Sequence, residues 1–423
     1  MKISKRFNIK SAEILCVGTE ILIGDIVNTN AAYISAQLAL LGIPHYYQAA
    51  VGDNPARLKD AIKSALDRSD LLIMSGGLGP TYDDLTKETA AECMGRRLYL
   101  DERSLQRIKD NFAFRCRPMT KNNEKQAYIP EGSVIFDNNA GTAPGCAIED
   151  EENGKIIIML PGPPFEMKRM FSESVMPYLQ QFTDTRFVSK NINIFGMGES
   201  AVESVLKELM LAAKNPTVAP YCGDGEVRLR VTASGATEAE CEALCDEMIE
   251  RIRGTEVGKF IYGLDTTLEK AVVEAYSKAG KTLSIAESCT GGLIAKRITD
   301  VSGSSGMFGY GTVTYANEAK IKVLGVKRET LEKYGAVSEE TAMELAAGIR
   351  ALSGADVGIS TTGIAGPGGG TETKPVGLVY MGIASEKGVR ALKFNFTGDR
   401  ARVRILASGN ALSLALNEIK EEE

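Results

Sequence analysis

The chain has 423 residues, which is more than one ordinary hydrophobic core supports, and this length predicts two or three domains. Its composition, 44% hydrophobic and 25% charged, is typical of a folded globular protein and excludes global disorder. The formal net charge of -6 argues against direct nucleic-acid binding, because phosphate contacts need a basic face.

The sequence shows neither a membrane helix nor a secretory signal. No stretch approaches the roughly 18 apolar residues that a membrane helix needs, and the basic N-terminus is not followed by an apolar segment. Eight cysteines are scattered without a CxxC pair, which predicts reduced thiols and a cytoplasmic location. The only histidine is His45, so a Ser-His-Asp triad in the C-terminal half is excluded.

The first predicted domain spans residues 1–180. Buried strands are expected at 12–18 and from 71 onward, and helices at 30–41 and 55–67, the second capped by Asn54. This βαβ rhythm predicts an α/β fold in which a mostly parallel sheet has helices on both faces. Binding sites in such folds lie beyond the carboxyl ends of the strands.

A candidate site follows the second strand, where the chain reads SGGLGPTYDDLT. Gly76, Gly77 and Gly79 allow a sharp turn that brings backbone amides close to a phosphate. Asp83 and Asp84 supply hard oxygen ligands for a divalent cation. The alternative is a glycine turn with two aspartates that cap the next helix.

Several strings of this domain resemble a known family. GTEILIGDIVNTN, GGLGPTYDDLT, NAGTAPG and LPGPPFEM, between residues 12 and 170, are similar to the molybdopterin-binding (MoaB/MoeA-like) domain of the CinA family. The resemblance implies a three-layer α/β fold and a pyrophosphatase that hydrolyses ADP-ribose with a divalent metal ion (Mg, Mn or Co). Pterin binding stays open, because both ligands present phosphate to the same glycine loop.

Residues 181–262 are predicted to be a small α+β connector domain. Strand-like segments at 191–196 and 226–235 alternate with helices at 201–214 and 238–253. The segment shows no cluster of catalytic side chains, and a structural role is expected.

The third predicted domain, residues 263–423, is again α/β. A capping box of Thr266 and Glu269 begins a helix that ends at Gly280. A buried strand follows, and βα alternation is expected to continue to the helix after Asp399.

A second candidate site follows this strand in the string AESCTGG. Ser288 stands where the strand gives way to a turn, with Thr290, Gly291 and Gly292 at the helix entry. Such a turn can expose a hydroxyl beside free backbone amides that stabilise an oxyanion. The alternative makes Ser288 or Thr290 a helix N-cap.

A lysine is the available base for this serine. Lys320 lies five residues after Tyr315, and a neutral lysine can accept a serine proton if burial lowers its pKa. Tyr315 would relay the proton or orient the lysine. The alternative is an ordinary exposed lysine on a helix.

Two later segments suit a mononucleotide. The glycine-rich stretch at 360–375 follows a strand, and its Thr362 and Gly363 are candidate wall or oxyanion residues. Arg400, in the string FTGDR, is placed to hold a 5′-phosphate through two hydrogen bonds. Asp399 and Arg400 are alternatively a simple helix-start pair.

These strings also resemble a family. AESCTGG, VTYANEAK, GAVSEETA, GIAGPGGG, KPVGLVY and FTGDR follow the CinA C-terminal domain in order. That domain is similar to nicotinamide mononucleotide (NMN) amidohydrolase, often called PncC. The resemblance implies a hydrolase that converts NMN to nicotinate mononucleotide and ammonia without a cofactor, with Ser288 as nucleophile and Tyr315 and Lys320 beside it.

Together the two resemblances imply a bifunctional enzyme of pyridine-nucleotide salvage, whose partners are the small molecules NMN and ADP-ribose. A homodimer is implied by resemblance, and contact with nucleic acid or a membrane is not expected. The alternative is a competence or damage-inducible protein that binds a nucleotide or pterin without catalysis in one or both domains.

Overall fold

The computed structural model describes residues 7–183, 186–223 and 225–420. It divides the chain into two compact units, one within Met1–Val188 and Ala233–Ala243 and the other within Ser189–Thr232 and Leu244–Glu423. Within the described residues no helix is both long and apolar enough to cross a membrane.

The N-terminal domain is built on a six-stranded sheet of order β2-β1-β3-β8-β7-β6. The first four strands of this order pair in parallel, and β7 pairs antiparallel with both β8 and β6. The strands are β1 (Ala12–Val17), β2 (His45–Val51), β3 (Leu71–Ser75), β6 (Val134–Phe136), β7 (Gly145–Asp150) and β8 (Lys155–Leu160), and β4 (Leu98–Leu100) pairs with β5 (Tyr128–Pro130).

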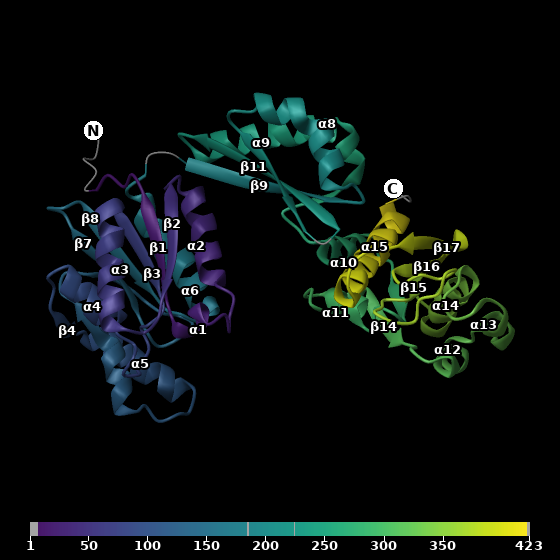
Figure 1. The fold of residues 1–423 in the computed structure, drawn as a ribbon, viewed down its shortest axis with the longest axis horizontal. Coiled ribbons are helices and arrows are strands. Elements are labelled where there is room, and N and C mark those ends of the chain that lie inside the picture. The colour runs from purple at the N-terminus through teal and green to yellow at the C-terminus, as the bar shows by residue number, and fades with distance from the viewer. Residues whose placement is uncertain (1–6, 184–185, 224, 421–423) are drawn as a thin grey trace. The chain divides into compact units, whose positions relative to one another are not determined.

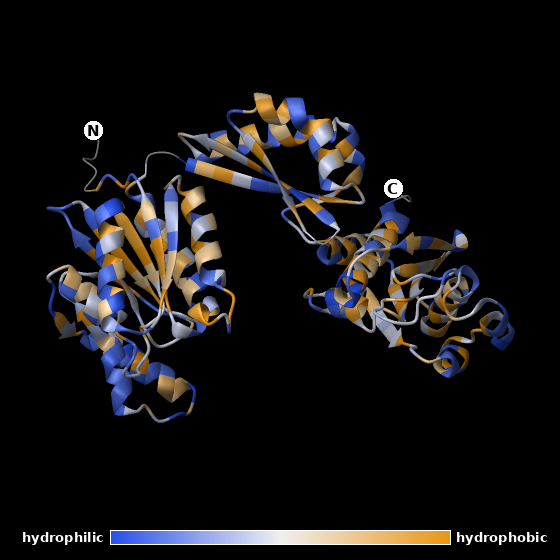
Figure 2. Ribbon diagram, viewed as in Figure 1, coloured by the Kyte–Doolittle hydropathy of each residue, from blue (hydrophilic) through white to orange (hydrophobic). Residues whose placement is uncertain are grey.

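Helices cover both faces of this sheet, so the three-layer α/β fold is confirmed (Figure 1). One apolar core lies under α2, α6 and α7, and a second lies under α3 and α4. Figure 2 shows apolar residues concentrated on the central strands between these layers. The helical elements are α1 (Thr19–Leu22), α2 (Thr29–Leu40), α3 (Pro55–Arg68), α4 (Thr86–Cys93), α5 (Glu102–Phe114), η1 (Lys121–Ala127), α6 (Pro164–Met170), η2 (Phe171–Val175) and α7 (Met176–Gln180).

The connector is α+β, as predicted, with two more strands, β10 and β12, than the sequence indicated. Its four strands have the order β10-β11-β9-β12. The elements are β9 (Arg186–Phe195), α8 (Glu199–Ala212), β10 (Thr217–Cys222), β11 (Glu226–Gly235), α9 (Glu238–Arg253), η3 (Glu256–Phe260) and β12 (Ile261–Leu264).

The C-terminal domain has a five-stranded sheet of order β14-β13-β15-β16-β17 between two helical layers. Helices α10, α11 and α15 cover one face, and α12, α13 and α14 cover the other. The elements are α10 (Leu268–Ala279), β13 (Leu283–Glu287), α11 (Leu293–Thr299), β14 (Phe308–Val313), α12 (Asn317–Leu324), α13 (Arg328–Tyr334), α14 (Glu339–Ser353), β15 (Val357–Gly363), β16 (Leu378–Ser385), β17 (Gly388–Asn395) and α15 (Arg400–Lys420).

Two details of this domain differ from the sequence prediction. The expected βα alternation is wrong after β15, because β15, β16 and β17 form an antiparallel meander without intervening helices. The N-cap of α10 is Thr267, whose side chain accepts a hydrogen bond from the amide of Lys270. The predicted Glu269 instead pairs with Arg297 at 2.7 Å, so a capping box starting at Thr266 is wrong.

Candidate active sites

Ser288 is the first residue beyond β13, at the carboxyl edge of the parallel part of the sheet. β13 is buried along its whole length, and its partners β14 and β15 are parallel to it. The amide of Ser288 donates to the carbonyl oxygen of Thr361 at 3.0 Å, which extends the pairing with β15 by one residue. The predicted position of Ser288 at the strand end is therefore confirmed.

Lys320 approaches Ser288 from α12 and is only 1% exposed. Its Nζ lies 3.2 Å from Ser288 Oγ, and it donates to the carbonyl oxygens of Thr314 at 2.8 Å and Tyr315 at 2.9 Å. None of these three partners carries a negative charge, and burial, the largest effect, lowers the pKa of Lys320. The structure thus brings a serine hydroxyl and a weakly basic amine together, and an exposed Lys320 is excluded.

The neighbouring thiol is a poor nucleophile. Cys289 is buried, and burial raises the pKa of its thiol to about 12. A thiolate is the reactive form of cysteine, and so high a pKa leaves little of it at neutral pH. Ser288 is therefore the better placed nucleophile of this turn, because its hydroxyl contacts the amine of Lys320.

The backbone amides of the turn after Ser288 donate hydrogen bonds within the turn and to the preceding residue. The amide of Gly291 donates to the carbonyl oxygen of Ser288 at 3.2 Å, and the amide of Gly292 donates to the carboxylate of Glu287 at 2.9 Å. The hydroxyl of Thr290 lies 2.8 Å from that of Thr361 in the interior. The amides of Gly291 and Gly292 are therefore not free for an oxyanion, because the turn itself occupies them.

Tyr315 and Arg400 meet at the surface beside this turn. The Nη2 of Arg400 donates to the hydroxyl of Tyr315 at 3.1 Å, and its Nη1 donates to the carbonyl oxygen of Gly366 at 2.9 Å. Arg400 is exposed, and Tyr315 is 60% exposed. The tyrosine thus orients Lys320 through its backbone carbonyl, while its hydroxyl contacts the arginine. Asp399 caps α15 by accepting a hydrogen bond from the amide of Arg402.

Thr362 and Gly363 lie at the end of β15. The hydroxyl of Thr362 donates to the carbonyl oxygen of Ala336 at 2.6 Å. A Cβ at Gly363 would lie 2.6 Å from the carbonyl oxygen of Leu378, so only glycine allows β15 and β16 to approach this closely. Both residues hold the fold together, and their contact with a substrate stays a prediction.

The glycine loop of the N-terminal domain turns sharply, as predicted. Gly76 and Gly77 have φ values of 108° and 68°, which glycine adopts readily. A Cβ at Gly76 would collide with the carbonyl of Val17, and one at Gly77 would collide with the hydroxyl of Thr86. The amide of Gly76 donates to the carbonyl oxygen of Leu160 at 3.0 Å, so it is not available to a phosphate.

Both predicted metal ligands turn toward Thr81. Its amide donates to the carboxylate of Asp84 at 2.9 Å, and its hydroxyl lies within hydrogen-bond distance of both aspartates. The hydrogen bond from Thr81 lowers the pKa of Asp83. A Cβ at Gly79 would collide with the Asp84 carboxylate, so the loop closes directly around it.

The donor set suits a substrate-bound cation. Among the described residues, no group of three or more His, Cys, Asp or Glu side chains could hold a metal ion. Mg²⁺ is commonly bound by one or two carboxylates, with phosphate oxygens and water completing the shell. Asp83 and Asp84 fit that pattern and do not fit an all-protein metal cage.

Two residues near the loop were not singled out from the sequence, although Asn30 ends the quoted string GTEILIGDIVNTN. Lys125, on η1, donates from Nζ to the carbonyl oxygens of Asp84 at 2.5 Å and Thr81 at 3.0 Å. Asn30, on α2, donates to Ser75 at 2.9 Å and to the carbonyl oxygen of Gly162 at 2.7 Å. Both lie far from the loop in sequence, and no local pattern points to Lys125.

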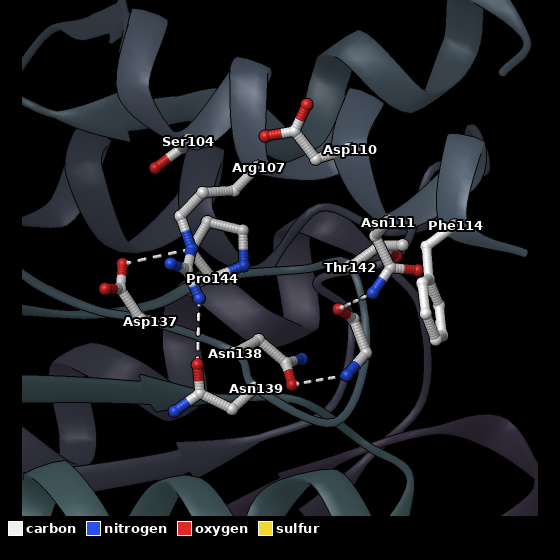
Figure 3. A pocket seen from close by; sticks show the side chains of 11 residues that line it. Ser104, Arg107, Asp110, Asn111, Phe114, Asp137, Asn138, Asn139, Thr142 and Pro144 are labelled. Carbon is white, nitrogen blue, oxygen red and sulfur yellow. Dashed lines mark hydrogen bonds and ion pairs between the residues drawn. The ribbon is translucent and has the colours of Figure 1, made fainter.

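The segment 137–145 lines a polar pocket of about 290 Å³ together with α5 (Figure 3). The side chain of Asn138 accepts from the amides of Ala140 at 3.0 Å and Gly141 at 2.7 Å, which fixes the turn. Arg107, on α5, donates to Asn139 at 2.8 Å. The string NAGTAPG, which carries part of the family resemblance, lies in this segment, whereas α5 was not part of that resemblance.

Comparison with known proteins matches this architecture part by part. The family models that match are "Probable molybdopterin binding domain" at residues 13–181, "Damage-inducible protein CinA KH domain" at 189–263 and "CinA C-terminal domain" at 265–419. They define a three-domain class of protein: a molybdopterin-binding-like domain, a KH-like connector and a CinA domain.

Two relatives match this chain over nearly the whole length of both proteins, and a solved structure matches part of it. The "CinA-like protein" of Kosmotoga olearia is 51% identical over 402 residues, which cover 95% of this chain and 97% of that protein. The "CinA-like protein" of Dictyoglomus thermophilum is 50% identical over 401 residues, which cover 95% and 97%. A crystal structure of the competence/damage inducible protein CihA from Agrobacterium tumefaciens is 42% identical, with 36% of this chain and 93% of that chain covered and a TM-score of 0.35. The chain belongs to the CinA family.

Proposed function

We propose that the C-terminal domain is an amidohydrolase that converts NMN to nicotinate mononucleotide and ammonia, with Ser288 as the nucleophile and Lys320 as its base. The observation that carries this proposal is the 3.2 Å approach of a buried lysine amine to a serine hydroxyl at a strand end. The substrate class comes from the resemblance to NMN amidohydrolases.

The contacts of Lys320 suit a neutral amine. A neutral amine has two N–H groups and one lone pair, and the carbonyl oxygens of Thr314 and Tyr315 accept the two N–H groups. The lone pair then faces the hydroxyl of Ser288, which donates its proton. Lys320 is thereby prepared as a general base by position and by burial.

The reaction then follows in two halves. As Lys320 takes the proton, Ser288 Oγ bonds to the carboxamide carbon of NMN, and the C–N bond breaks as the lysine returns the proton to the leaving nitrogen. Ammonia departs and leaves an ester on Ser288. A water molecule, deprotonated by Lys320, attacks the ester carbonyl, and the proton returns to Ser288 as nicotinate mononucleotide is released.

The exposed guanidinium of Arg400 is suited to the 5′-phosphate. It lies beside the turn through its contact with Tyr315, and guanidinium binds phosphate through paired hydrogen bonds. The purified chain with NMN should release ammonia, and Ser288→Ala should release none. Cys289→Ala is the matched control beside it and should keep the parental rate. Ammonia release by Ser288→Ala at the parental rate would remove the proposed nucleophile.

We further propose that the N-terminal domain hydrolyses ADP-ribose with a divalent metal ion. The glycine loop closed around the Asp84 carboxylate supports this proposal, since a carboxylate held in the loop can share a divalent ion with a bound phosphate. Thr81 contacts both carboxylates, and Lys125 donates hydrogen bonds to the backbone carbonyl oxygens of Thr81 and Asp84. A divalent ion bound there would neutralise phosphate charge and make its bound water more acidic.

ADP-ribose hydrolysis should therefore require added divalent metal and should stop with a chelator. If the domain binds a pterin phosphate and leaves ADP-ribose intact under these conditions, the alternative of binding without catalysis replaces this proposal.

We do not expect the connector to bind nucleic acid directly, although KH domains elsewhere bind single strands. Residues 189–263 hold twelve acidic and eight basic side chains, so the segment is acidic. Phosphate contacts need a basic surface, and this balance disfavours one. The proposed partners remain small nucleotides, with a homodimer as the proposed assembly.

A further inference from the structure

Glu287 is a buried carboxylate that the proposed chemistry does not use. It is the last residue of β13, directly before Ser288, and it is 1% exposed. Its two oxygens accept hydrogen bonds from the amides of Gly292 at 2.9 Å, Ile294 at 3.1 Å and Ala295 at 2.9 Å. A buried carboxylate is costly unless such bonds compensate its lost hydration.

These bonds close the nucleophile turn on itself. The carboxylate belongs to the residue before Ser288, and its three donors belong to residues after the turn, in the first part of α11. The start of a helix presents unpaired amides and partial positive charge, so a carboxylate there is stabilised. Glu287 precedes the turn in the chain, and its carboxylate is hydrogen-bonded to the residues that follow the turn. The path of residues 288–292 is therefore fixed at both ends.

Two outer contacts hold the same turn from other elements. Arg404, on α15, donates from Nη2 to the carbonyl oxygen of Thr290 at 2.7 Å. The amide of Ser288 donates to Thr361 on β15. Glu287 is the link that joins the strand to the helix, and the Ser288 hydroxyl extends from the segment between them.

We infer that Glu287 is a positioning residue, which sets the location of Ser288 Oγ relative to Lys320 Nζ by bonding the amides of Gly292, Ile294 and Ala295. The inference rests on the proposed function of this site and deepens it. Loss of the carboxylate lets the turn shift, and the serine then leaves the reach of its base. Substrate binding by the rest of the site is unaffected.

Glu287→Gln tests the inference with little change in volume. A glutamine keeps one carbonyl oxygen, but its NH₂ faces an amide donor and the charge is lost. Because a misplacement of about 1 Å can cost about 100-fold in rate, kcat for NMN should fall about 100-fold while KM stays within about twofold. Glu287→Asp keeps the charge but reaches less far, so its kcat should lie between that of the parent and that of Glu287→Gln.

Glu344→Gln is the matched control. Glu344, on α14, also accepts from a backbone amide, that of Lys327 at 2.8 Å, and from the hydroxyl of Thr330 at 2.8 Å. It belongs to the same domain and bonds the α13 region rather than the nucleophile turn. This variant should keep the parental kcat, and an equal loss would show that the effect of Glu287 is general destabilisation.

A substrate-independent readout separates this inference from the proposed function. A fluorophosphonate probe labels an activated serine, and its rate on Ser288 can be followed by intact mass, with Ser288→Ala as the blank. Slower labelling of Glu287→Gln supports the positioning role even if the parent protein proves inactive on NMN. Parental labelling and parental kcat in folded Glu287→Gln, or in Glu287→Asp if the glutamine variant does not fold, would overturn it.

Discussion

Replacement of Lys320 by methionine removes the proposed base with almost no change in volume. The side chain is fully buried, and methionine is close to it in length, so the packing of α12 should persist. A general base of this kind contributes about 10²–10⁴-fold to the rate, so NMN deamidation by Lys320→Met should fall at least 100-fold. Ser288→Ala/Lys320→Met should be hardly slower than either single variant, because the two residues act as one unit.

Stability should change much less than activity. Lys320→Met leaves the carbonyl oxygens of Thr314 and Tyr315 without this donor, and each lost hydrogen bond costs about 1 kcal/mol. Removal of a buried amine offsets part of that cost. A net change within about 2 kcal/mol keeps a domain of this size folded. Lys322→Met, on the exposed side of the same helix, is the control and should match the parent in both respects.

The pH profile of kcat/KM provides the second readout. The base must be neutral, so the rate should be low at acid pH and rise as Lys320 loses its proton. Burial lowers the pKa of Lys320, so this rising limb should lie below the ordinary lysine value of about 10.4. A parental rate in folded Lys320→Met would refute the proposed base, and so would a flat profile across this range.

Two further predictions concern substrate and metal. Arg400→Ala should raise KM for NMN about 10- to 100-fold, the equivalent of a lost charged hydrogen bond, with kcat little changed, and an unchanged KM would assign the arginine to the helix start alone. Tyr315→Phe should change kcat only a few-fold, because the hydroxyl of Tyr315 contacts Arg400. A large loss of kcat would instead support a role of this hydroxyl as a proton relay. Asp84→Ala should abolish metal-dependent ADP-ribose hydrolysis and leave NMN deamidation unchanged, whereas parental ADP-ribose hydrolysis would remove Asp84 as a ligand.

The sequence predicted the elements whose signals are local. The buried run before Ser288 and the glycines after it placed the serine at a strand end, and the absence of a C-terminal histidine directed attention to a lysine. The meander after β15 was missed because an apolar strand looks the same in parallel and antiparallel sheets. The shift of the α10 cap to Thr267 arose from two adjacent threonines that both suit the position.

Other features depend on contacts that no local pattern carries. The burial of Lys320 depends on how α12 packs against the sheet, and its sequence is also that of an exposed helix. Glu287 has the place of an ordinary last strand residue until its three amide partners are known. Lys125 reaches the glycine loop from η1, about 40 residues away, so only the fold brings it there.

The covalent step is tested most directly by rapid quenching of the protein with NMN, followed by intact and peptide mass spectrometry. The account predicts a transient ester of nicotinate mononucleotide on the peptide that contains Ser288, which forms within the first turnover and is absent in Ser288→Ala. Full ammonia release without any adduct, together with turnover by Ser288→Ala, would instead mean direct attack by water and would contradict a serine nucleophile.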